Sequence, residues 1–153
     1  MLVSVGLEDR IDPQLMVPDL QSEDRIGAIK ELVDRMHNAG WVDDSLSFLQ
    51  SVLVREDLES TVVTEGVAFP HARSHAVNRL GAAFGVSRQG IRFGDQGEPV
   101  YVVCLLGVPA SNSAEYLPFL ARVSQTFDDR VFQEHLLECP TSEHMYWTIR
   151  AAL

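Results

Sequence analysis

The residues best suited to chemistry lie in one stretch, Gly66-Val67-Ala68-Phe69-Pro70-His71-Ala72-Arg73. An apolar run typical of a β-strand reaches Pro70, and His71 follows at once. Histidine is a nucleophile that is partly neutral near pH 7. Pro70 has a fixed φ and biases Phe69 towards extended geometry. We therefore expect His71 at a defined position in a loop just past a strand end, where open α/β sheets place their chemistry.

Three arginines lie near this stretch, in segments expected to be loops or helix ends: Arg55, Arg73 and Arg79. A guanidinium group can bind a phosphoryl group through two parallel hydrogen bonds. A guanidinium group near a histidine also disfavours protonation of the ring, so the neutral nucleophile persists. The pattern favours a nucleophilic role for His71, and a histidine that only caps or packs after the strand is the alternative.

Other kinds of site find less support in the residue pattern. His71 and His75 would share one face of a helix and could then bind a metal, but Pro70 and Ser74 weaken a helix here and no third ligand is evident. The chain has no Gly-x-Ser-x-Gly motif and no glycine-rich phosphate loop. Cys104 lies within an apolar run, so we expect it to be buried and unreactive. We expect no metal site.

Composition limits the class of protein. The chain has 153 residues, of which 46% are hydrophobic, and we expect one domain over residues 1–153. A formal net charge of −10 argues against nucleic acid as a main partner. No apolar stretch approaches the ~20 residues of a membrane span, and the first ten residues do not resemble a secretory signal. With the thiols of Cys104 and Cys139 expected to be reduced, we expect a cytoplasmic protein.

Periodicity and turn residues predict the elements that position His71. Helices are expected before and after the strands, which indicates an α/β fold with a mixed β-sheet flanked by helices on both faces. A loop or hairpin is expected at 89–97. The expected helices begin at Ser22, at Asp43 or Asp44, after Asn112 or Ser113, at Asp128 or Asp129, and at Thr141; the expected strands lie within 60–70, 80–86 and 100–108.

Two motifs in order carry a family resemblance: Arg55-Glu56-Asp57-Leu58-Glu59-Ser60-Thr61, then Gly66 to Arg73. They resemble the fructose/mannitol-type enzyme IIA domain of the bacterial phosphotransferase system, including its nitrogen-regulatory branch. The likeness extends over nearly the whole chain, including the helix that ends before Gly40, the apolar strand 102–108 and the junction Phe127-Asp128-Asp129.

The resemblance implies a mixed sheet flanked by helices and a phosphoryl carrier. His71 would accept a phosphoryl group from the phosphocarrier protein HPr or an HPr-like protein. It would pass the group to an enzyme IIB domain or hold it as a regulatory signal to another protein. Arg55 and Arg73 would supply positive charge and Thr61 a hydroxyl hydrogen bond. No metal or organic cofactor is implied, and a membrane would be involved only indirectly, through a sugar permease.

One departure from the family pattern bears on function. The family usually carries a second histidine where this chain has Tyr116, between Glu115 and Leu117. The Tyr116 hydroxyl can donate a hydrogen bond to a phosphoryl oxygen but cannot carry positive charge, and Glu115 adds negative charge. The alternative function is therefore a binding or regulatory module that keeps the fold and has lost efficient phosphotransfer.

Overall fold

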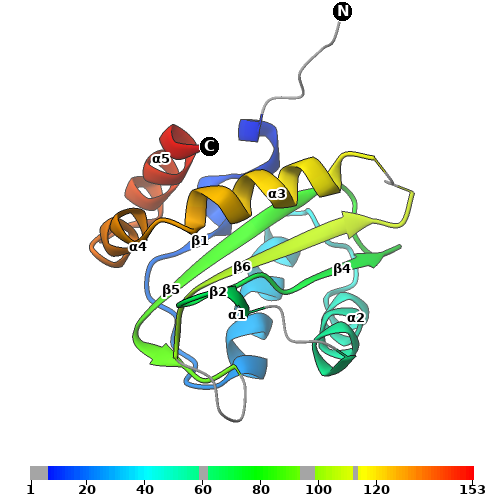
Figure 1. Cartoon of the computed structure of the whole chain (residues 1–153). Coiled ribbons are helices and arrows are strands. Elements are labelled where there is room, and N and C mark those ends of the chain that lie inside the picture. The colour runs from blue at the N-terminus through cyan, green and yellow to red at the C-terminus, as the bar shows by residue number, and fades with distance from the viewer. Residues whose placement is uncertain (1–6, 59–61, 94–98, 112–113) are drawn as a thin grey trace, which may run out of the picture.

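The computed structural model describes residues 7–58, 62–93, 99–111 and 114–153. Its centre is a mixed sheet in the order β1-β5-β6-β3-β2, with β4 also paired to β6 (Figure 1). β5 and β6 are antiparallel, whereas β3 and β4 both run parallel to β6. The strands are β1 (Met16–Val17), β2 (Val62–Thr64), β3 (Val67–Ala68), β4 (His71–Ser74), β5 (Gly81–Ile91) and β6 (Val100–Pro109).

Helices cover both faces of this sheet, as the sequence predicted. Helices α1 (Arg25–Asn38) and α2 (Ser45–Leu58) pack on one face, and α3 (Tyr116–Phe127), α4 (Arg130–Leu137) and α5 (Ser142–Ala152) on the other. In Figure 1, α3 crosses the near face and α1 lies behind the sheet. Two short 3-10 helices, η1 (Leu7–Arg10) and η2 (Pro13–Leu15), precede β1.

The central strand β6 explains why both faces must be covered. Val103 and Leu105 pack with α1 and α2, whereas Cys104 and Leu106 pack with the helices of the opposite face. Successive side chains of a strand point to opposite faces, so an apolar residue at every position buries both. The predicted strand 100–108 is thereby confirmed. No helix among the described residues is long and apolar enough to cross a membrane.

Two of the predicted helix starts are correct, and the one at Ser22 is wrong. Asp129 and Thr141 accept backbone N–H bonds at the starts of α4 and α5, as expected of N-caps. The predicted start at Ser22 is wrong, because Asp24 accepts the bond from Gly27 N at 2.7 Å. The backbone N of Ser22 instead donates to Glu31 at 2.8 Å.

The predicted loop or hairpin at 89–97 is correct as a hairpin, because β6 follows β5 and pairs with it antiparallel, but its first residues belong to β5. β5 continues to Ile91, and its pairing with β6 shifts register between Val86 and Ile91. Gly90 adopts φ 89° in this interval. A glycine at positive φ lets a strand accommodate such an irregularity and continue. Residues 94–98 lie outside the described part of the chain, as do Asn112 and Ser113, the expected cap of the helix after β6.

Candidate functional site

His71 is the first residue of β4 rather than part of a loop, which corrects the sequence expectation. Val67 pairs with Val102 and His71 with Leu106, so β3 and β4 keep the same register along β6. Pro70 interrupts the strand because it has no N–H to donate, yet its carbonyl accepts a bond from Leu106 N at 3.0 Å. The interruption therefore leaves the pairing partner of His71 fixed.

The imidazole of His71 is anchored through one of its two nitrogens. Nδ1 lies 2.9 Å from the carbonyl oxygen of Phe69, and the residue is half-buried. A carbonyl oxygen only accepts hydrogen bonds, so Nδ1 carries the proton in this contact. In the neutral ring, Nε2 then keeps its lone pair. The local backbone thus presents Nε2 as the nucleophilic nitrogen.

His71 and Arg73 lie on the same face of β4. Ala72 between them packs into the core under α1 and α2, so alternation directs His71 and Arg73 to the face that α3 covers. The guanidinium carbon of Arg73 lies 5.3 Å from the ring centroid of Tyr116, the first residue of α3. Arg73 and Tyr116 therefore meet at the junction of β4 and α3, and His71 lies two residues from Arg73 on the same face of β4.

Glu115 does not stand as an uncompensated negative charge beside Tyr116. It forms an ion pair with Arg10, at the end of η1. The side chain of Arg10 is only 16% exposed, against 48% for Glu115. Sequence reasoning missed Arg10, since a pair separated by 105 positions leaves no local pattern.

Arg55 lies in the last turn of α2, which packs against β4 on the face of the sheet opposite to α3. No contact among the described side chains joins Arg55 to His71. Thr61, the expected hydroxyl donor, lies outside the described residues.

Two other residues near the motif have different surroundings. Arg79 stacks on the Trp41 ring at 3.8 Å and donates to the carbonyl oxygen of Asp9 at 3.1 Å. It is thus held by the first segment of the chain. His75 is exposed in the turn after β4. Because His71 lies on a strand, the two histidines do not take the helical spacing of a metal motif, and the described residues contain no group of three possible metal ligands.

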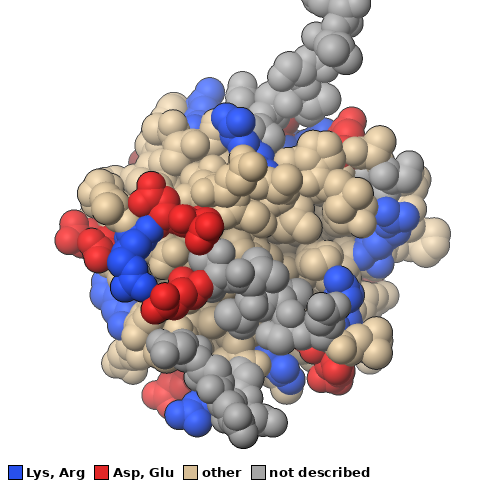
Figure 2. Space-filling view, viewed as in Figure 1, with Lys and Arg blue, Asp and Glu red and all other residues tan. Residues whose placement is uncertain are grey.

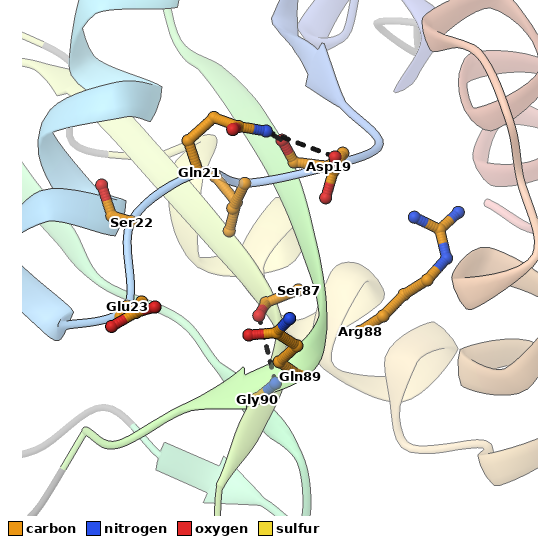
Figure 3. Close-up of a pocket in the computed structure, with 9 residues that line it drawn as sticks. Asp19, Gln21, Ser22, Glu23, Ser87, Arg88, Gln89 and Gly90 are labelled. Atoms are coloured by element: carbon orange, nitrogen blue, oxygen red, sulfur yellow. Dashed lines mark hydrogen bonds between the residues drawn. The ribbon is translucent and has the colours of Figure 1, made fainter.

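A polar hollow of about 380 Å³ lies elsewhere, between the segment 19–23 and residues 87–90 of β5 (Figure 3). His71 is opposite Leu106, and Leu106 is opposite Ala82 at the other end of β5. Polar groups of the hollow bond to one another: Gln21 to Asp19 and Gly90 to Ser87. The Arg88 guanidinium bonds to three backbone carbonyls. The hollow is separate from His71.

Charge is unevenly distributed over the visible face. Figure 2 shows several Lys and Arg side chains on the right, over β4 and α2, and a group of Asp and Glu side chains on the left, over α4. Lys and Arg side chains thus gather on the side where β4 ends, in a chain of net charge −10. Such a region suits an anionic group. The expected burial of Cys104 is confirmed, and burial raises the pKa of its thiol well above 9.0.

Comparison with known proteins assigns the fold and the family. A family model described as "Phosphoenolpyruvate-dependent sugar phosphotransferase system, EIIA 2" matches residues 10–152. The fructose-specific EIIA component of Haloferax volcanii is 33% identical over 118 residues, which cover 76% of this chain and 77% of that protein. Some relatives are longer: the chain spans 20% of the fructose-specific EIIABC component of Bacillus subtilis.

Solved structures share the fold. The nitrogen regulatory protein IIA-Ntr from Neisseria meningitidis superposes with a TM-score of 0.81 at 23% identity, covering 95% of this chain and 97% of that one. In a complex of mannitol enzyme IIA with phosphorylated enzyme IIB from Escherichia coli, the matching chain gives 0.78 at 18% identity, covering 92% and 97%. With the family model over nearly the full length, these matches show that the chain belongs to the EIIA 2 family of the phosphoenolpyruvate-dependent sugar phosphotransferase system.

Proposed function

We propose that this protein is a phosphoryl carrier that accepts its phosphoryl group on Nε2 of His71. The observation that carries the proposal is the 2.9 Å contact between Nδ1 and the Phe69 carbonyl, because it leaves Nε2 with its lone pair. The family assignment supports the proposal, because it implies a role in phosphoryl transfer. Because His71 belongs to strand β4, the backbone fixes the position from which its side chain presents Nε2.

The transfer step forms one bond and breaks one. The Nε2 lone pair forms a bond to phosphorus, while the bond between phosphorus and the donor breaks and its electron pair stays with the donor. The Nδ1 proton remains hydrogen-bonded to the Phe69 carbonyl oxygen, which stabilises the positive charge that develops on the ring. No proton has to leave Nε2 before the attack.

Basic side chains stabilise the transferred group. Arg73 lies on the same face of β4 as His71. Arg55, in the last turn of α2, is proposed as the second basic side chain. Their guanidinium groups are suited to the phosphoryl oxygens. The Thr61 hydroxyl completes the proposed set. The donor already carries the phosphoryl group in an activated form, so the protein needs only to position the reactants and stabilise the charge of the transition state. The proposed step therefore requires no metal or organic cofactor.

The donor is proposed to be HPr or an HPr-like protein. The onward partner is an enzyme IIB domain, as named in the Escherichia coli mannitol complex, or a regulated protein, as in the nitrogen-regulatory branch. A membrane enters only through a permease that such a IIB domain serves. With these proposed partners, we propose that the protein acts in the cytoplasm.

Intact mass tests the proposal after incubation with phosphoenolpyruvate, enzyme I and HPr or HPr-like proteins. The wild type should gain one acid-labile phosphoryl group, and His71→Ala should gain none. His75→Ala, which removes an exposed histidine four positions on, is the matched control and should gain the group. Phosphorylation of His71→Ala would refute the site. No gain by the wild type with any donor would favour a binding module that keeps the fold without phosphotransfer.

A further inference from the structure

The ring of Tyr116 contacts the guanidinium of Arg73 across the junction of α3 and β4. The Arg73 guanidinium carbon lies 5.3 Å from the ring centroid, within the distance at which a cation is attracted to an aromatic face. The contact engages the ring of Tyr116, whereas the sequence had pointed to its hydroxyl. The two residues are separated in the chain by the strands β5 and β6 and meet only in the fold.

The two partners differ in how firmly the fold holds them. Tyr116 is half-buried and packs against the core of the α3 side, and Phe119 on the same helix is buried. The residue before it, Glu115, is tied to Arg10 by the ion pair. Arg73 is exposed on β4. A long arginine side chain has many rotamers, so an aromatic face that favours some of them reduces the disorder of its charge.

The position of Arg73 gives this contact a consequence for His71. Both side chains leave β4 on the face covered by α3, two residues apart. A guanidinium held at this junction therefore lies on the face of β4 that carries the acceptor ring. Arg73 supplies positive charge at this junction, where Tyr116 supplies none.

We infer that Tyr116 is a positioning residue, whose aromatic ring holds the Arg73 guanidinium beside the phosphoryl group accepted by His71. The inference rests on the proposed function and deepens it, because it assigns the ring and not the hydroxyl as the active part of Tyr116. Two consequences follow. Phenylalanine replaces tyrosine without loss, and the effect of losing the ring depends on the presence of Arg73.

Single-turnover transfer from phosphorylated HPr to His71, at saturating donor, tests both consequences. Tyr116→Phe should transfer within about twofold of the wild-type rate. Tyr116→Leu should be about fivefold slower, the factor expected from loss of an exposed cation–aromatic contact. In an Arg73→Gln background, Tyr116→Leu should cause no further loss. A Tyr116→Phe as slow as Tyr116→Leu, an unchanged Tyr116→Leu, or the same fivefold loss without Arg73 would each overturn the inference.

A second measurement does not depend on phosphorylation. Protons that lie over an aromatic face are shifted upfield in NMR spectra, so the Arg73 side-chain protons should be shifted in the wild type and in Tyr116→Phe. They should lose the shift in Tyr116→Leu, with the amide spectrum of a folded protein retained. Unshifted Arg73 protons in the wild type would overturn the inference without any variant. Shifted protons in a wild type that accepts no phosphoryl group would refute the proposed function and the positioning role, leaving only the contact.

Discussion

His71 is hydrogen-bonded to Phe69, two residues before it, from Nδ1 to the carbonyl oxygen at 2.9 Å. The bond spans Pro70 and keeps the proton of the neutral ring on Nδ1, which leaves the lone pair on Nε2. It is also the one polar contact that His71→Ala would remove from the described site.

We therefore expect His71→Ala to fold. Loss of one intramolecular hydrogen bond costs roughly 0.5–1.5 kcal/mol of unfolding free energy, and His71 is only half-buried. Urea unfolding of the variant should be cooperative, with a midpoint slightly below that of the wild type and of His75→Ala. An unfolded His71→Ala would mean that the histidine has a structural role that its contacts do not show.

Arg55→Gln should slow the loading of His71 about tenfold, since one charge-assisted bond to the phosphoryl oxygens is lost. Arg35→Gln is a matched control, because Arg35 is an exposed arginine in the last turn of α1 and its replacement changes net charge equally. Rapid-quench kinetics with phosphorylated HPr would measure both. Equal rates for the two variants would remove Arg55 from the site.

The Arg10–Glu115 ion pair should contribute weakly and in a salt-dependent way. Glu115 is about half exposed, and pairs of this kind contribute on the order of 0–1 kcal/mol. Arg10→Gln should lower the thermal midpoint at low salt, and added salt should reduce the difference. Lys30→Gln breaks the more exposed pair with Asp34 and should have a smaller effect. The opposite order would contradict the burial argument.

Gly81→Ala should destabilise the fold by about 1–3 kcal/mol, since its methyl group would overlap the Trp41 ring. That ring has little freedom to move, because Arg79 stacks on it. Gly107→Ala is the control: its methyl group would approach the flexible end of Met36 at 3.0 Å. Chemical denaturation should give the larger loss for Gly81→Ala, and equal losses would show that the Trp41 ring can move.

The buried thiol of Cys104 should make the free energy of unfolding fall at alkaline pH. Burial raises the pKa of its thiol well above 9.0, so the unfolded chain releases this proton at lower pH than the folded protein. The thiol therefore leaves stability unchanged below about pH 8 and lowers it as pH rises past 9, by at most about 1.4 kcal/mol per pH unit. Cys104→Ala should show a shallower decline in unfolding free energy over this range. Parallel curves would contradict the prediction.

Local sequence predicted the elements whose ends depend on nearby residues. Asp129 and Thr141 were found as caps because a cap bonds to N–H groups two or three residues away. Ser22 was the wrong cap, because Asp24 accepts the N–H bond of Gly27, whereas the backbone N–H of Ser22 donates to Glu31 within α1. Residue type does not distinguish Ser22 from Asp24, since both are good N-cap residues.

The residues of the site could be chosen from the sequence, but their arrangement could not. His71 and the arginines were chosen by residue type and by the resemblance, both of which are properties of the sequence. Their grouping was decided by pairing with β6, which makes His71 part of a strand and turns Arg73 towards α3. The partner of Arg79 and that of Glu115 each come from residues 9–10, far away in the chain.

By itself, the sequence determined the family, the α/β class, the residue that carries the proposed chemistry and the coverage of both sheet faces, because these follow from residue types at short spacing. Only the tertiary structure decided that Tyr116 presents its ring to Arg73 and that Glu115 is compensated by Arg10. The physical reason is that strand register and helix packing bring together residues whose separation in the chain leaves no periodic signal.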